Sequence, residues 1–339
     1  MVLKTLLAGL LALSFTAPAL AAPQTVSNSV VSLGVSGSRG GSIDSFKILG
    51  TEIVDTADLG REIQASLFFN SQQPGLQQNN TTCNASPPPW LNPQDAGNEC
   101  GVASPWYALG KTGNRLDVGT LPKEWHGRGN GPNNLINGLR IEGHHTVGPL
   151  PYANFNEVTQ LRYQVFWNAE YAGQPALQFQ RSVFDGNSQP TPTSFLPAAY
   201  FKSSQFVRPV GLPMDGGDWV DLQPSANVST GSYTPSLYRF RAVAWMRQDL
   251  SLGVALYARS TLNQTCAQTF TMELPQQQGQ CPNFAVVGFP ALGAVNVSVV
   301  DQSLTSIPLN GSVERVAHMF VGNLPTMRSQ INAVYNSGN

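Results

Sequence analysis

Apolar and polar side chains alternate without a break along Gln160–Trp167. Leu161, Tyr163, Val165 and Trp167 fall on one side of an extended segment, and glutamine or arginine side chains fall on the other. A period of two is that of a β-strand with one buried face. A chain that repeats runs of this kind must bury them face to face, which predicts a sheet-on-sheet architecture.

Further runs of strand length recur through the chain, separated by turns rich in Gly and Pro. We expect Leu177–Phe184 to pair with Gln160–Trp167 across a turn at Gly173. The other expected strands include Ile43–Leu49, Ile63–Phe69, Leu135–Val147, Leu237–Met246, Gln268–Leu274 and Ser312–Phe320.

A helical pattern stands near the end of the chain, in Pro325–Tyr335, where Met327, Ile331, Val334 and Tyr335 form an apolar stripe. Many short strands and one terminal helix predict an all-β fold, namely a large antiparallel two-sheet sandwich with one short C-terminal helix. Residues 22–339 show no internal repeat and no change of composition, so we expect them to form a single domain.

Residues 1–21 have the pattern of a secretory signal peptide. Lys4 supplies the positive charge, Leu6–Phe15 the apolar core, and Ala19-Leu20-Ala21 the small residues of a cleavage site. A retained anchor is the alternative, but the apolar run is short for a bilayer. No later stretch is long and apolar enough to predict a membrane span, so we expect an exported, extracellular protein.

Four cysteines remain in the expected mature chain: Cys83, Cys100, Cys266 and Cys281. An even number in an exported protein predicts two disulfides, for which three pairings are possible. The local pairs, Cys83–Cys100 and Cys266–Cys281, are favoured because each brackets a polar loop. Metal binding is the alternative, but no Cys-x-x-Cys spacing supports it, and no metal site is predicted.

Seven Asn-x-Ser/Thr sequences are candidate glycosylation sites in a eukaryotic secretory pathway. Chance occurrence in a chain rich in Asn, Ser and Thr is the alternative. The seven asparagines are Asn79, Asn80, Asn84, Asn227, Asn263, Asn296 and Asn310.

The charge pattern limits the classes of partner. Charged residues make up 12% of the chain, and 19 Lys and Arg nearly balance 20 Asp and Glu. Nucleic-acid binding needs a basic face, which this balance does not predict. A surface rich in uncharged polar groups suits hydrogen bonding to neutral partners such as sugars. The motifs of nucleotide-binding loops, zinc peptidases and serine hydrolases do not occur, and no cofactor is predicted.

Candidate ligand-binding residues lie at the polar corner Asp55–Arg61, which leads into the expected strand Ile63–Phe69. Asp58, Arg61 and Gln64 are brought to one place by the corner before Ile63–Phe69. Arginine and amide side chains can orient sugar hydroxyls. An ion pair between Arg61 and a neighbouring aspartate, which would stabilise the corner, is an equally open interpretation.

Acid–base chemistry would have to come from elsewhere in the chain. Trp125 and His126 stand in a Gly-rich loop, where a histidine can exchange protons and a tryptophan can stack on a sugar ring. Glu157 begins an expected strand and is the candidate partner carboxylate, or else a solvated strand-edge carboxylate. His144 and His145 are adjacent in a β-region, so they point to opposite faces and cannot bind one metal together.

The Gly-Gly-Ser-Ile start of the Gly40–Phe69 segment resembles that of galactose-mutarotase-like β-supersandwich proteins. More narrowly, three segments resemble an exported group of that superfamily. They are Asp58-Leu59-Gly60-Arg61-Glu62-Ile63-Gln64, Trp90-Leu91-Asn92-Pro93-Gln94-Asp95-Ala96-Gly97 and Pro122-Lys123-Glu124-Trp125. The resemblance implies a supersandwich fold, which hosts sugar epimerases, polysaccharide lyases, glycosidase-associated domains and binding proteins.

These features lead to two functional hypotheses. The first is a secreted enzyme, a lyase or a glycoside hydrolase, that cleaves a polysaccharide or oligosaccharide in a concave β-sheet cleft. His126 and Glu157 would be catalytic, Arg61, Gln64 and Asp58 would bind substrate, and Trp90 and Trp125 would form stacking walls. The second is a non-catalytic extracellular glycan-binding protein. The sequence does not predict the oligomeric state.

Overall fold

The computed structural model describes twelve parts of the chain. They are residues 23–36, 39–56, 62–68, 90–91, 106–121, 139–167, 176–178, 194–224, 235–266, 270–289, 293–304 and 306–339. The predicted signal peptide and the predicted Cys83–Cys100 pair lie outside these residues. Within them, no helix is long and apolar enough to cross a membrane.

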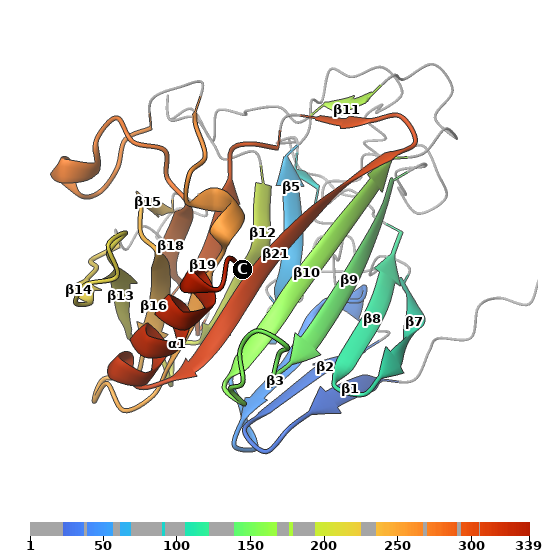
Figure 1. Ribbon diagram of the computed structural model, residues 1–339, viewed down its shortest axis with the longest axis horizontal. Coiled ribbons are helices and arrows are strands. Elements are labelled where there is room, and N and C mark those ends of the chain that lie inside the picture. Colours follow the sequence, from blue (N-terminus) through green and yellow to red (C-terminus); the bar gives the residue numbers. More distant parts are fainter. Residues whose placement is uncertain are drawn as a thin grey trace, which may run out of the picture.

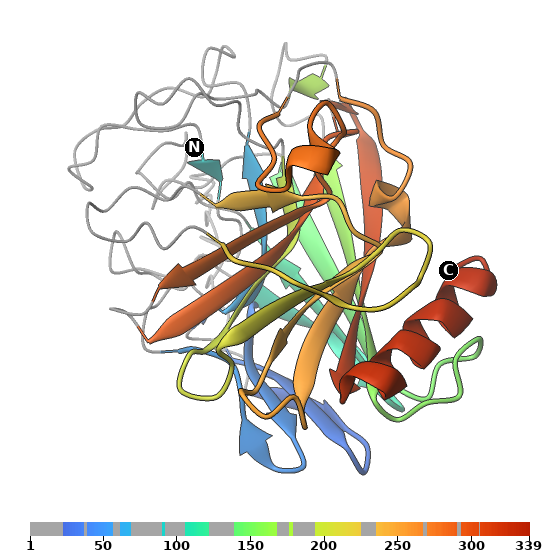
Figure 2. The same ribbon diagram turned by 90° about the vertical axis from the view of Figure 1, so that its left-hand side faces the viewer.

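Two large antiparallel sheets make up the fold, which confirms the predicted all-β, two-sheet architecture (Figures 1 and 2). The first sheet has ten strands, and β4 pairs with β3 and β6 with β5 beside its main path. Its main path is β1 (Gln24–Ser27), β2 (Val31–Val35), β3 (Ile43–Ile48), β5 (Ile63–Phe68), β12 (Ser194–Lys202), β19 (Ala294–Asp301), β18 (Phe284–Phe289) and β15 (Ser236–Tyr238), with β4 at Thr51–Glu52 and β6 at Trp90–Leu91.

The second sheet has nine strands. Its order is β14 (Val220–Asp221), β13 (Arg208–Leu212), β16 (Ala242–Met246), β17 (Gly253–Tyr257), β21 (Gly311–Gly322), β10 (Val158–Trp167), β9 (Leu139–Val147), β8 (Arg115–Thr120) and β7 (Trp106–Thr112). A separate two-stranded sheet joins β11 (Ala176–Gln178) to β20 (Ser306–Pro308). Two 3-10 turns lie at Arg259–Thr261 and Pro275–Gln277.

The hydrophobic core lies between the two large sheets. In β10, Leu161, Tyr163, Val165 and Trp167 are buried in it, which is the face that the sequence alternation predicts. The same alternation in β9 buries His145 completely and leaves His144 on the outer face. The prediction that these two imidazoles point to opposite faces is confirmed.

The helix α1 (Leu324–Asn336) covers one end of the outer face of the nine-stranded sheet (Figure 1). Asn323 caps it, because its side-chain oxygen accepts a hydrogen bond from the Thr326 backbone N–H at 2.9 Å. Met327, Ile331 and Val334 are buried against apolar residues of β13, β16, β17 and β21, and Tyr335 packs half-buried against the same cluster. The predicted helix and its apolar stripe are confirmed.

The predicted pairing of Gln160–Trp167 with Leu177–Phe184 is wrong. Strand β10 lies between β9 and β21, and β11 pairs with β20 instead. A strand has two hydrogen-bonding edges, and β9 and β21 occupy both edges of β10 along its length.

Two further strand predictions need correction, and side-chain amides explain both. Leu237–Met246 is divided into β15 and β16, which belong to different sheets. At the break, the Asn283 side chain accepts a hydrogen bond from the Phe240 backbone N–H at 3.0 Å and donates one to the Phe240 carbonyl at 2.7 Å. The described part of Gln268–Leu274, residues 270–274, forms no strand. There the Gln278 amide bonds the backbone of Met272 in place of a neighbouring strand.

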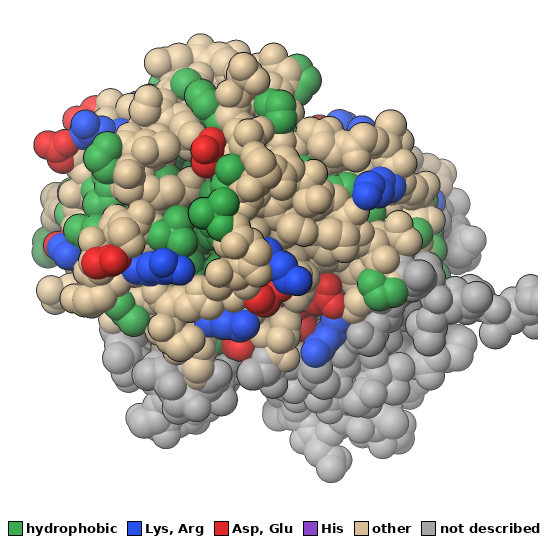
Figure 3. All heavy atoms as spheres, turned by 90° about the horizontal axis from the view of Figure 1, so that it is seen from below, with side chains coloured by type: hydrophobic (Ala, Val, Ile, Leu, Met, Phe, Trp, Pro, Cys, Tyr) green, Lys and Arg blue, Asp and Glu red, His purple; other side chains and the backbone are tan. Residues whose placement is uncertain are grey.

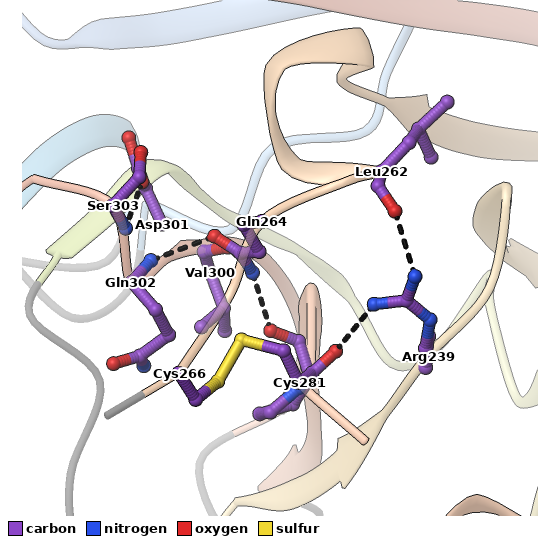
Figure 4. Close-up of a disulfide and its surroundings, with 10 residues drawn as sticks. Arg239, Leu262, Gln264, Cys266, Cys281, Val300, Asp301, Gln302 and Ser303 are labelled. Carbon is purple, nitrogen blue, oxygen red and sulfur yellow. Dashed lines mark hydrogen bonds between the residues drawn. A yellow bond between two sulfur atoms is a disulfide. The ribbon is translucent and has the colours of Figure 1, made fainter. Parts of the chain in front are cut away.

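The predicted Cys266–Cys281 disulfide is confirmed (Figure 4). Beside it, the Gln264 amide N–H groups donate to the carbonyls of Pro282 (2.6 Å) and Val300 (3.0 Å), and its oxygen accepts from the Gln302 backbone N–H. The disulfide and this amide together fasten the segment after β17 to the ends of β18 and β19.

The described glycosylation candidates differ in accessibility. Asn263 and Asn310 are exposed. Asn296 is fully buried in β19, where its side-chain N–H donates to the Ala199 carbonyl at 3.0 Å. A glycan on Asn296 would require this amide to leave the folded sheet. The other four candidate asparagines lie outside the described residues.

Acidic and basic side chains are intermixed on the end of the molecule shown in Figure 3. No broad field of one sign is seen on that face, in agreement with the near balance of charges in the sequence.

Candidate functional site

The outer face of the nine-stranded sheet carries polar residues in rows, beyond the end that α1 covers. Cross-strand register sets the first row, in which His318 of β21, Gln160 of β10, Thr146 of β9 and Arg115 of β8 are successive neighbours. Neighbouring strands lie about 4.8 Å apart, so this row spans roughly 14 Å.

The second row runs parallel to the first, two residues further along each strand. It contains Val316, Arg162, His144 and Asp117. The alternation of the strands places both rows on the outer face, because the residues between them face the core. The polar face is therefore a direct consequence of the pattern that predicts the strands.

A depression of about 910 Å³ opens over the first row. Arg115 and Asp117 line one side, Gln160 and Tyr152 line the other, and Thr146 lies between them. The remaining lining residues are Thr112, Asn114, Pro149, Leu150, Pro151 and Asn154.

The loop between β9 and β10 forms one wall of this depression and carries Tyr152 (green in Figure 1). It begins at Gly148, whose N–H donates to the Val158 carbonyl at 2.7 Å. Within the loop, Leu150 and Ala153 exchange two backbone hydrogen bonds. The Asn28 side chain donates to the Gly148 carbonyl at 2.7 Å and thereby ties the loop to the other sheet.

Gly148→Ala is expected to lower the free energy of unfolding by about 3 kcal/mol. A Cβ at this position would lie 2.0 Å from the Phe155 carbonyl oxygen, so the backbone of the loop would have to move. Urea denaturation measures the change. Gly288→Ala is the matched control, because nothing lies within 4 Å of a Cβ there. Equal effects of the two substitutions would contradict the prediction.

Asp117 and His144 form a carboxylate–imidazole pair beside the depression. Nδ1 of His144 lies 2.7 Å from Oδ1 of Asp117, and Nε of Arg115 donates to the same oxygen at 2.6 Å. Burial alone would raise the pKa of Asp117, but the hydrogen bonds from Arg115 and His144 outweigh it and hold this pKa below its ordinary value. The other imidazole nitrogen, Nε2, lies 3.6 Å from Oε2 of Glu142.

The charges on this face are paired. Arg140 contacts Glu142 at 3.1 Å, and Arg162 contacts Glu314. The face therefore offers hydrogen-bond donors and acceptors without a surplus of either sign, which suits an uncharged polar ligand. Among the described residues, no group of three His, Cys, Asp or Glu side chains is arranged to hold a metal ion.

Tyr152 contacts two residues of the first row. The Gln160 side-chain N–H donates to the phenolic oxygen, and Nε2 of His318 lies 2.6 Å from the same oxygen. Burial raises the pKa of Tyr152 to about 12, although the Gln160 hydrogen bond acts in the opposite direction. Burial also lowers the pKa of His318 to about 4. At neutral pH, both side chains are therefore uncharged.

Of the seven catalytic and substrate-binding residues predicted from the sequence, the structure describes three: Gln64, Trp90 and Glu157. Arg61, Asp58, Trp125 and His126 lie outside the described residues. Trp90 begins β6, next to Phe68 of β5.

Gln64 and Glu157 are both described, on different sheets. Gln64 is buried on β5, between Ile63 and Ala65, which face the core, so its side chain belongs to the outer face of the ten-stranded sheet. Glu157 precedes β10 and accepts a hydrogen bond from Gln330 of α1 at 3.2 Å, on the outer side of the nine-stranded sheet. The structure does not bring these two residues together.

Sequence reasoning missed Arg115, Asp117 and Tyr152 as candidates. The available signal was the alternation in β9, where every second residue is polar and faces away from the core. These residues are Arg140, Glu142, His144 and Thr146. The residues of β8 that lie beside these polar residues, Arg115 and Asp117, can be identified only when the register between β8 and β9 is known.

No protein-family model matches this sequence. No curated protein matches it.

The chain is structurally similar over nearly its full length to galactose mutarotase-like and aldose 1-epimerase proteins. One is a putative aldose 1-epimerase from Escherichia coli K12, with 9% identity over 89% of this chain and 99% of that chain and a TM-score of 0.45. Another is a galactose mutarotase related enzyme from Lactobacillus acidophilus, with 10% identity, 89% and 98% coverage and a TM-score of 0.46. A galactose mutarotase-like protein from Lactobacillus casei ATCC 334 has 9% identity, 88% and 99% coverage and a TM-score of 0.43.

Proposed function

We propose that this chain is a secreted carbohydrate-active protein that cleaves a polysaccharide, as a lyase or a glycoside hydrolase. The observation that supports it best is the depression on the nine-stranded sheet, where Arg115, Asp117, Tyr152 and Gln160 converge. Arginine, carboxylate and amide groups read sugar hydroxyls, and an aromatic side chain can pack on a pyranose ring. The paired charges favour a neutral glycan and so fit a hydrolase better than a lyase, because a lyase acts beside the carboxylate of a uronic acid.

Acid–base chemistry has a candidate source at this depression. An imidazole that is held by a carboxylate is a common proton-exchanging group, and Asp117 holds His144 in this way. The roles expected for His126, Glu157, Arg61, Gln64, Asp58, Trp90 and Trp125 stay predictions, to be tested beside this pair.

Secretion is supported by the signal-like pattern of residues 1–21 and by the Cys266–Cys281 disulfide. Structural disulfides persist in oxidising compartments and are rare in the cytosol.

A non-catalytic glycan-binding protein is the second candidate. The pairing of Arg115 with Asp117 at 2.6 Å, and of Arg162 with Glu314, is compatible with it, because charges that pair with each other fit a binding surface as well as a catalytic one.

A glycan array followed by a depolymerisation screen tests the proposal. The screen should measure both new reducing ends and the ultraviolet absorbance of unsaturated products. Reducing ends without absorbance indicate a hydrolase, and absorbance indicates a lyase. Binding without products supports the second candidate, and neither binding nor products from a broad set of glycans contradicts both.

A further inference from the structure

The hydroxyl group of Tyr152 is held by two side chains at the depression. Its oxygen lies within hydrogen-bond distance of two described side chains, Gln160 and His318. The rings of Tyr152 and His318 meet edge to face, with centroids 5.8 Å apart. Tyr152 is half-buried and His318 is 2% exposed, so the two residues join the depression to the sheet beneath it.

The surroundings of His318 decide which of its ring nitrogens carries the proton. Burial keeps the ring neutral at physiological pH, so only one nitrogen is protonated. Nδ1 has no hydrogen-bond partner among the described residues. A buried N–H without an acceptor is rarer in proteins than a buried acceptor without a donor. The proton therefore belongs on Nε2, which donates it to the Tyr152 oxygen.

The same reasoning fixes the direction of the Tyr152 O–H bond. The phenolic oxygen accepts one hydrogen bond from His318 and one from Gln160, so its acceptor positions are filled. Its own proton cannot point at either donor. The remaining open side of the hydroxyl is the depression, which Tyr152 lines.

We propose that Tyr152 is a hydrogen-bond donor to an ether or hydroxyl oxygen of a neutral sugar in this depression, and that His318 is the positioning residue that directs the donor. The identification of the bound oxygen with a sugar rests on the proposed function; the direction of the O–H bond does not. The two arginines of the neighbouring rows, Arg115 and Arg162, are paired with carboxylates, so the site carries no surplus positive charge for an anion.

Nitrogen-15 NMR of the histidine side chains tests the positioning step without any ligand. We expect the His318 ring to show a protonated Nε2 and a bare Nδ1 at pH 7.5. His318→Gln identifies the resonances by their loss. A protonated Nδ1 would mean that Tyr152 donates to His318, and that result overturns the proposal.

Binding to three neutral hexasaccharides, cellohexaose, xylohexaose and maltohexaose, tests the role of the donor by calorimetry. Tyr152→Phe is expected to weaken the affinity for the hexasaccharide that binds best by about five- to tenfold, the worth of one neutral hydrogen bond. Tyr335→Phe on α1 is the matched control and should leave the affinity unchanged. Unchanged binding by Tyr152→Phe overturns the proposal.

His318→Gln separates positioning from support of the fold. Glutamine keeps an N–H that can donate to the Tyr152 oxygen, so it should retain more of the affinity than His318→Leu, with circular dichroism confirming that both variants are folded. Equal losses in the two folded variants overturn the positioning role. Absence of binding to all three hexasaccharides overturns the sugar assignment, and the NMR result then still decides the direction of the O–H bond.

Discussion

Asp117→Asn is expected to slow the proposed polysaccharide cleavage by about 10²- to 10⁴-fold, the usual contribution of a general acid–base group. The substitution keeps the shape of the side chain but removes the charge of a carboxylate whose Oδ1 lies 2.7 Å from Nδ1 of His144 and accepts a hydrogen bond from Arg115 at 2.6 Å. The imidazole then loses the carboxylate that orients it. Initial rates of reducing-end or unsaturated-product release, on the glycan that the depolymerisation screen identifies, measure the effect.

Asp221→Asn is the matched control for this prediction. Asp221 also pairs with an arginine, Arg208, at 2.6 and 2.8 Å, but it lies on β14 at the far edge of the same sheet. We expect its loss to leave cleavage unchanged. Full activity of the Asp117→Asn protein would contradict the assignment. If the Asp117→Asn protein keeps its cleavage rate and the His126→Gln protein loses it, the reaction belongs to the loop that carries Trp125 and His126.

The parts of the fold that were predictable are those set by local periodicity. The period of two in β10 identifies its buried face, and the period of the last helix identifies the stripe around Ile331. The same logic places His144 and His145 on opposite faces. These outcomes depend only on neighbours within a few residues, which the sequence displays directly.

The candidate site was not predictable in this way because it depends on strand register. Asp117 and His144 are 27 residues apart and meet only because β8 pairs with β9 in one register. Tyr152 and His318 are 166 residues apart. The error over the partner of β10 has the same origin: either edge of a strand can accept many partners, and the choice is made by long-range packing.

Three buried titratable groups make stability depend on pH. Burial lowers the pKa of His145 to about 3, with a smaller contribution from His144, and lowers that of His318 to about 4. Both folded-state pKa values lie below the ordinary histidine value of 6.5. As the pH falls below 6.5, the unfolded chain therefore binds protons that the folded chain does not, and the folded state loses stability. Glu62 acts in the opposite direction between about pH 4.5 and 7, because burial raises its pKa to about 7.

The difference in unfolding free energy between wild type and His145→Leu should therefore grow as the pH falls. Above pH 6.5 the difference should be constant, with the variant more stable by about 1–3 kcal/mol because neither imidazole nitrogen has a hydrogen-bond partner among the described residues. Below pH 6.5 the advantage of the variant should grow by about 1.4 kcal/mol per pH unit, reaching roughly 3 kcal/mol more near pH 4. Glu62, His318 and the other carboxylates are present in both proteins, so their contributions cancel in the difference. Urea denaturation of the two proteins at each pH from 8 to 4 measures it. A difference that stays constant over this range would mean that His145 takes up a proton in the folded protein as readily as in the unfolded chain.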